Sequence, residues 1–245
     1  MDSQHERYDE VVRNKLNLHR SEKPPMVTTT IQFDLLTNAT DSISYAIELL
    51  AWPDIRNDER RMKQAILSIS QGVELLLKER LRRIHPAFMF EDVDKFPSLD
   101  ARTVGAERAL MRLKSISGYL VRDSDTQLMR DLRRTRNAIE HAEWHTTLAE
   151  AKAIVGAALS FAIDFAKSEL DRDLSYEFRR EDTWGQLLTE LHEFAAAHAR
   201  RLAANAGVDQ LNMMTCDVCH HETLDRLEQS CPLCGHWNSD EEVPF

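Results

Sequence analysis

The chain has 245 residues, of which 42% are hydrophobic and 29% are charged, and it contains only seven Gly and seven Pro. This composition indicates a helix-rich globular protein with room for one sizeable domain and a small appendage. No apolar run approaches the roughly 20 residues that a membrane span needs, and the N-terminus lacks the apolar segment of a signal peptide, so we expect a cytoplasmic protein with no membrane contact. The net charge of −10 argues against indiscriminate nucleic-acid binding.

A polar arm of residues 1–27 opens the chain and ends in Lys23-Pro24-Pro25, where the prolines stop any helix. The next segment, 28–170, predicts an all-α fold, an antiparallel helical bundle, because its apolar residues recur at the three-and-four spacing of a buried stripe. The expected helices span residues 28–52, 59–84, 104–120, 124–143 and 148–170. The expected caps of the first, fourth and fifth helices are Thr28-Thr29-Thr30, Asp123-Ser124-Asp125 and Thr146-Thr147.

Two connecting segments accompany this bundle. The loop after the second helix carries Phe88, Phe90 and Phe96, which either cover the core or stack on bases. Residues 171–212 predict a polar hinge, over 171–182, and then one amphipathic helix that ends near Ala206.

The four cysteines of the chain form two Cys-x-x-Cys pairs, Cys216 with Cys219 and Cys231 with Cys234. A two-residue spacer lets both thiolates of a pair face one ion, and two pairs complete a tetrahedral four-sulfur shell of the kind that binds zinc. Residues 213–238 therefore predict a zinc ribbon, followed by an acidic tail at 239–245. Because four protein ligands leave no open position, we expect a structural zinc and no catalytic metal. Gly235 after the second pair suits a turn with positive φ, whereas His220 takes the matching place in the first pair.

Positive charge is concentrated in the middle of the chain. Lys and Arg exceed Asp and Glu by four over residues 56–85 and again by four over 102–122. Arg130, Arg133 and Arg134 follow as candidate RNA-binding residues. A basic region within an acidic protein can hold a phosphate backbone at one place, although solvated helix faces would give the same pattern.

The hexapeptide from Arg136 to His141, Arg-Asn-Ala-Ile-Glu-His, sets a permanent cation, an amide and an imidazole close together in one helix. A guanidinium can neutralise a phosphate, and an imidazole can transfer a proton near neutral pH. On a regular helix Arg136 lies about 140° from His141, which is awkward for a site on one helix. Two copies meeting across a symmetric interface would bring two Arg–His sets into one cleft. The alternative is an ordinary polar helix face.

This hexapeptide resembles the Arg-Asn-x-x-x-His signature of HEPN domains, which are helical bundles about the size of residues 28–170. Residues 69–78 also resemble the earlier buried helix of that family. The resemblance implies a metal-independent endoribonuclease that is usually dimeric and often serves as a toxin or in defence against phage. It implies that Arg136 binds the scissile phosphate, that His141 is the general acid or base, and that Asn137 orients either His141 or a phosphate oxygen. The ribose 2′-OH would attack the phosphorus, so the substrate would be RNA rather than DNA.

The sequence also departs from the family pattern and leaves two functions open. Glu143 stands where many HEPN toxins have a Tyr that is modified by a partner, so that form of control is not expected. We expect Glu74 and Glu140 to pair with nearby Arg residues. The leading hypothesis is a homodimeric ribonuclease acting on tRNA or mRNA, restrained by a protein partner or antitoxin, with a zinc ribbon that holds RNA. The alternative is a non-catalytic adaptor that binds RNA, nucleotide or a protein partner, with Arg136 paired to a carboxylate.

Overall fold

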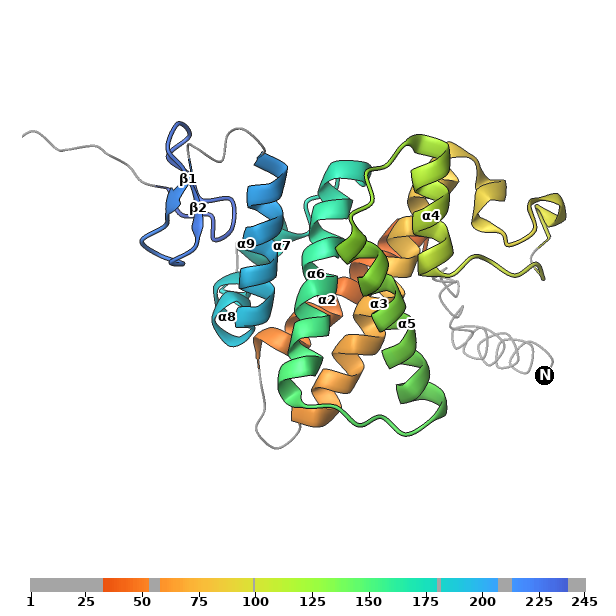
Figure 1. Cartoon of the computed structure of the whole chain (residues 1–245), viewed down its shortest axis with the longest axis horizontal. Coiled ribbons are helices and arrows are strands. Elements are labelled where there is room, and N and C mark those ends of the chain that lie inside the picture. The colour runs from red at the N-terminus through yellow and green to blue at the C-terminus, as the bar shows by residue number, and fades with distance from the viewer. Residues whose placement is uncertain (1–32, 53–57, 99, 180–181, 207–212, 238–245) are drawn as a thin grey trace, which may run out of the picture. The chain divides into compact units, whose positions relative to one another are not determined.

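The computed structural model describes residues 33–52, 58–98, 100–179, 182–206 and 213–237, and these are mostly helical with a small two-stranded sheet (Figure 1). The α-helices are α2 (Leu35–Ala51), α3 (Asp58–Ile84), α4 (Ala106–Ser117), α5 (Asp123–His141), α6 (Leu148–Leu170), α7 (Ser175–Arg179), α8 (Thr183–Glu190) and α9 (His192–Ala206). Two short 3-10 helices, η1 (Pro86–Met89) and η2 (Val93–Lys95), lie between α3 and α4, and strands β1 (Met213–Thr215) and β2 (Glu222–Asp225) pair antiparallel. Among the described residues, no helix combines the length and the hydropathy needed to cross a membrane.

The first helix begins later than the sequence predicts. Asp34 caps α2, because its carboxylate accepts a hydrogen bond from the backbone N–H of Thr37 at 2.7 Å. Phe33 and Asp34 are therefore not helical, and the predicted cap at 28–30 lies outside the described residues. The other four bundle helices begin and end within a few residues of their predicted bounds.

Two glycines allow helices to approach closely. A Cβ on Gly72 of α3 would lie 2.5 Å from Ile43 Cγ1 of α2, and a Cβ on Gly156 of α6 would lie 2.6 Å from the backbone nitrogen of Phe194 in α9. Real Cβ atoms do not approach other heavy atoms so closely, so any larger residue would push these helices apart. Gly72 thus fixes the α2–α3 pair, and Gly156 fixes α9 against α6.

Helix α6 lies in the middle of the bundle, with α5 on one side and α9 on the other in Figure 1. Its predicted start is confirmed: Thr147 and Glu150 form a capping box in which each side chain bonds to the other residue's backbone N–H. Twelve of its 23 residues are buried, and the rings of Phe161 and Phe165 stack with their centroids 5.5 Å apart. Helix α6 is therefore the central helix of the bundle.

The predicted cap of α5 is wrong. The residue before the helix is Arg122, which makes no capping hydrogen bond from its side chain. Asp125 is instead buried within the first turn and pairs with Arg201 of α9, which also contacts Asp164 of α6 at 3.4 Å. One guanidinium thereby links α9 to both α5 and α6.

The segment after α6 is more ordered than a polar hinge. It contains α7, and the side chains of Leu174 and Phe178 are buried in the core. The single amphipathic helix predicted up to Ala206 is two helices, since the backbone turns at the buried Leu191 (φ −120°, ψ 71°). This turn directs Phe194 onto Gly156, so α8 and α9 belong to the same hydrophobic core as α6.

Candidate functional site

Helix α5 carries the Arg136–His141 hexapeptide near its C-terminal end. Leu128, Leu132 and Thr135, which are three or four residues apart, are buried on its inner face. His141 is the last residue of the helix, and its side chain is 75% exposed. The imidazole therefore faces solvent, where a large substrate can reach it.

One carboxylate connects the two predicted catalytic side chains. Glu140 Oε2 lies 3.0 Å from Arg136 Nε and 3.9 Å from His141 Nε2. Because Arg136 Nε and His141 Nε2 both lie near the same oxygen atom, these two nitrogens are close to each other. The angle of about 140° on an ideal helix therefore does not keep these groups apart, because the long Arg136 side chain bends toward the helix end. The expectation that one helix gives an awkward site is corrected by this contact.

Arg136 also reaches a second carboxylate, on the neighbouring helix. Its Nη1 lies 3.9 Å from Glu74 Oε2 of α3. The other oxygen of Glu74 accepts a hydrogen bond from Lys78 Nζ at 2.6 Å, and Lys78 also donates to Thr103 Oγ1 at 2.9 Å. The predicted pairing of Glu74 and Glu140 with Arg is confirmed, and this chain of contacts ties the guanidinium to a buried part of α3.

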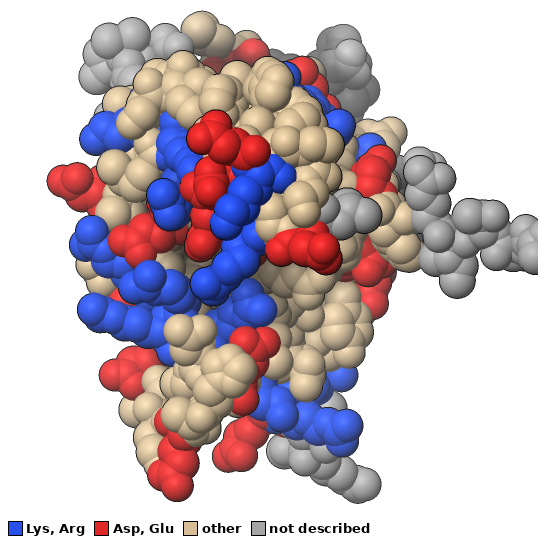
Figure 2. Space-filling view, turned by 90° about the vertical axis from the view of Figure 1, so that its right-hand side faces the viewer, with Lys and Arg blue, Asp and Glu red and all other residues tan. Residues whose placement is uncertain are grey.

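A groove of about 630 Å³ lies beside Arg136, between α3, α4 and α5. Arg136 and Asn137 line it, together with Ser70 and Glu74 of α3. The rest of its wall is mixed: it includes the side chains of Glu91, Arg102, Glu107, Arg108, Met111, Met129, Leu132 and Arg133. Among the described residues, the Asn137 side chain makes no hydrogen bond and thus does not orient His141 here. Figure 2 shows Lys and Arg side chains gathered on the side of the molecule where α4 and α5 lie, with acidic side chains among them.

The three arginines predicted to bind RNA differ in their surroundings. Arg130 and Arg133 both pair with Glu107 of α4, at 3.0 Å and 3.4 Å. Arg134 has no ion pair with any residue that the structure describes. Part of the basic charge in this region is therefore already neutralised.

The loop aromatics pack against one another rather than project into solvent as a stack. The ring centroids of Phe90 and Phe96 lie 5.7 Å apart, and His85 contacts the rings of both Phe88 and Phe96. Arg112 of α4 donates hydrogen bonds to the backbone carbonyls of Phe88 and Phe90 and so anchors the loop. Of the two predicted roles, this packing favours covering the core.

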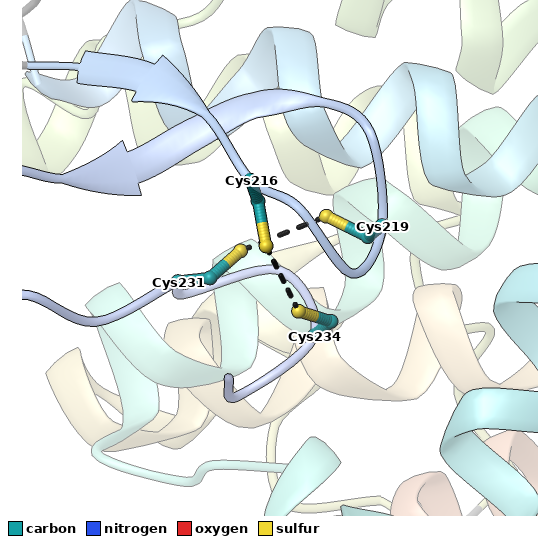
Figure 3. Close-up of side chains that lie close together, drawn as sticks. All are labelled: Cys216, Cys219, Cys231 and Cys234. Carbon is teal, nitrogen blue, oxygen red and sulfur yellow. Dashed lines mark hydrogen bonds between the residues drawn. The ribbon is translucent and has the colours of Figure 1, made fainter. Parts of the chain in front are cut away.

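The four cysteines converge on one point (Figure 3). Their sulfurs all lie within 4.8 Å of one another, and the Cys216–Cys234 and Cys219–Cys231 pairs are each 3.7 Å apart. A tetrahedral zinc ion with Zn–S bonds of about 2.3 Å requires sulfurs separated by about 3.8 Å. The distances are too long for disulfide bonds and fit a zinc ion.

The backbone around these sulfurs repeats itself. Each Cys-x-x-Cys pair ends in a turn. In the first turn the backbone N–H of His220 donates to the carbonyl of Cys216, and in the second the N–H of Gly235 donates to the carbonyl of Cys231, both at 2.8 Å. His220 has φ 59° and Gly235 has φ 79°. His220 therefore adopts the same left-handed backbone conformation as Gly235 in the second turn. Because His220 has a Cβ atom, this conformation carries a steric cost that glycine avoids. Hydrogen bonds from the Cys234 thiol and Thr223 lower the pKa of the Cys231 thiol, and the same contact with Cys231 raises the pKa of Cys234.

Residues 213–237, here called the cysteine module, pack on the helices. The indole N–H of Trp184 in α8 donates to the backbone carbonyl of Leu233 at 2.8 Å, and both side chains are buried. Arg179 of α7 donates to the carbonyl of Pro232 at 2.6 Å. Ala199 of α9 joins the small core of the module. The sequence gives Trp184 only as part of a helix stripe, because a contact with residues almost fifty positions away has no local signal.

The charge of the cysteine module is negative. Its acidic residues outnumber Arg226, its only Lys or Arg; they are Asp217, Glu222, Asp225 and Glu228. Four thiolates around one Zn²⁺ would add two further negative charges. This surface does not favour a phosphate backbone.

A comparison of the chain with known protein families, with characterised proteins and with solved structures finds no match. The likeness to HEPN domains therefore rests on residues 69–78 and 136–141 and on their helical setting.

Proposed function

We propose that this protein is a metal-independent endoribonuclease of the HEPN type, in which Arg136 and His141 act on one RNA phosphate. The observation that carries the proposal is the contact of a single carboxylate, that of Glu140, with both side chains. An anion already lies between a guanidinium and an exposed imidazole. A phosphate that takes its place can accept hydrogen bonds of about 2.8 Å from both groups.

The reaction follows from these groups and from the family resemblance. The 2′-oxygen of the substrate ribose attacks the phosphorus as its proton leaves to a base. The bond from phosphorus to the 5′-oxygen breaks, and that oxygen receives a proton. Arg136 stabilises the charge that develops on the phosphate oxygens, and His141 transfers one of the two protons. The products are a 2′,3′-cyclic phosphate and a free 5′-OH.

Two transfers at opposite sides of the phosphorus call for two proton-transfer groups. A homodimer would supply the second group as another copy of His141. The exposure of His141 at the end of α5 leaves it accessible to a second chain as well as to RNA.

We assign the cysteine module to stability rather than to holding RNA. Its sulfurs fit a zinc ion, it packs on α8 and α9, and its negative charge opposes a phosphate backbone. The zinc would be structural because all four positions are taken by protein sulfurs. In this reading RNA binds at the groove beside α5, whose wall carries both Arg and Glu side chains. A toxin or phage-defence role requires that expression of the active chain arrest growth.

The decisive experiment is RNA cleavage in EDTA by the wild-type protein, by His141→Ala and by His145→Ala. His145 is a matched control, since its side chain is 87% exposed four residues away and pairs only with Glu143 among the described residues. Wild type and His145→Ala should cleave tRNA or mRNA at similar rates, and His141→Ala should lose at least a hundred-fold. Zinc content is measured alongside, to show that EDTA has not removed the structural ion. Equal cleavage by all three proteins, or none by wild type, would overturn the proposal.

One observation favours a second candidate, a non-catalytic adaptor that binds RNA, nucleotide or a protein partner. Such an adaptor requires Arg136 to be paired with a carboxylate, and Arg136 contacts both Glu140 and Glu74. In an adaptor these contacts serve stability, so Arg136→Ala would lower the melting temperature of a protein that cleaves no RNA. In the ribonuclease, Arg136→Ala abolishes cleavage with a change of stability under about 1 kcal/mol, because the side chain is partly exposed.

A further inference from the structure

The groove between α3, α4 and α5 contains cations that the protein does not neutralise. Its wall includes Arg102 and Arg108, and neither guanidinium has an ion pair with any residue that the structure describes. On the α5 side of the groove, Arg133 pairs with Glu107. Arg136 pairs with Glu140 and Glu74. The two unpaired guanidiniums are therefore the ones free to bind an anionic ligand.

The groove also offers an apolar surface. Met111 of α4 is 41% exposed on the groove wall, and Met129 and Leu132 of α5 lie beneath it as buried core side chains. Methionine side chains are flexible and polarisable, and they pack well against the face of an aromatic ring. A ligand with both a flat ring and a phosphate would use both parts of this wall.

A buried hydroxyl lies at the base of the groove. Ser70 of α3 is 7% exposed, and its Oγ has no hydrogen-bond partner among the described residues. Buried hydroxyls without a partner are rare because each costs free energy. Ser70 lines the groove, and a contact between this hydroxyl and a ligand requires a rotation about its side-chain bond χ1.

We propose that this groove holds one RNA nucleotide adjacent to the scissile phosphate, an inference that rests on the proposed ribonuclease function. The base lies against Met111, Ser70 contacts its polar edge or its ribose, and the next phosphate along the RNA binds Arg102 and Arg108. The volume of about 630 Å³ is sufficient for one nucleotide. Ser70 and Arg108 thereby become residues that determine where the RNA is cut.

Binding is measured with a fluorescent 2′-O-methyl RNA hexanucleotide of mixed sequence, which cannot be cleaved because its nucleophile is blocked. The proteins are wild type, Ser70→Ala, Arg108→Gln and the control Lys114→Gln. Lys114 is an exposed residue of the same helix as Arg108, but it does not line the groove, and its replacement removes the same charge. Arg108→Gln should weaken binding about ten-fold and Ser70→Ala about three-fold, while Lys114→Gln should change it less than two-fold. Abasic ribose at one position of the oligonucleotide should also cost about ten-fold.

Weaker binding by either groove variant, with Lys114→Gln unchanged, supports the site. Unchanged binding in both groove variants overturns it, as does an equal loss in Arg108→Gln and Lys114→Gln, which would indicate a general effect of charge. Because the probe is not cut, these results are independent of catalysis. If cleavage requires His141 but the groove variants bind the RNA as tightly as the wild type, this inference alone is contradicted. A chain that binds through the groove but cleaves no RNA would contradict the proposed function alone.

Discussion

The carboxylate of Glu140 occupies the position at which we expect a phosphate, so removing its charge should strengthen RNA binding. Glu140→Gln keeps the shape of the side chain and removes the negative charge that lies 3.0 Å from Arg136 Nε. Two unit charges about 4 Å apart interact by about 1 kcal/mol in water and by more at a protein surface. Because the Glu140 side chain is 33% exposed, we take the lower value, which corresponds to about five-fold tighter binding.

The assay is titration of an uncleavable 2′-O-methyl RNA at low salt, with Glu143→Gln as the matched control. Both substitutions change the net charge by one, and the side chain of Glu143 is 92% exposed and contacts His145 rather than Arg136. Glu143→Gln should tighten binding less than two-fold. If Glu140→Gln instead weakens binding, then Glu140 holds Arg136 in place for another purpose, and the reasoning that it stands in for a phosphate is wrong.

Three further predictions concern stability. His220→Gly should stabilise the cysteine module by about 1 kcal/mol in thermal unfolding, because it relieves a left-handed backbone at φ 59°, and a lower melting temperature would contradict that view. Burial lowers the pKa of His198 to about 3, so between about pH 3 and 6.5 the unfolded chain binds a proton that the folded chain does not. The free energy of unfolding should therefore rise with pH over this range, by up to about 1.4 kcal/mol per pH unit. Urea unfolding at pH 5.0 and 6.5 should show this slope reduced in His198→Gln but not in the exposed His192→Gln. If the four sulfurs hold zinc as proposed, chelation of the ion should expose Trp184 and shift its fluorescence to longer wavelength, a shift absent in Trp184→Phe, while the helical circular dichroism persists.

The sequence predicts the parts of this fold that depend on local pattern. The apolar spacing of α3 and α6 locates both helices, and Thr146-Thr147 locates the cap of α6. Two Cys-x-x-Cys pairs predict a cluster of four sulfurs, and the structure brings these sulfurs together. Each of these signals lies within a few residues of sequence.

The features that the sequence does not predict depend on contacts between distant residues. Asp125 reads as a helix cap, yet it is buried because Arg201 on α9 reaches it. No glycine or proline stands at Leu191 to predict the break between α8 and α9. The break follows from the packing of α9 on α6. The angle of about 140° between Arg136 and His141 describes where the two side chains leave the helix. It does not account for the length of these side chains, which both reach the carboxylate of Glu140.

The most direct test of the central claim is the chemistry of the RNA ends. If Arg136 and His141 act on one phosphate, RNA cut by the wild-type protein in EDTA should carry 2′,3′-cyclic phosphate and 5′-OH ends, and His141→Ala should produce neither. Fragments with 3′-OH and 5′-phosphate ends, or the same cyclic ends from His141→Ala, would contradict the account.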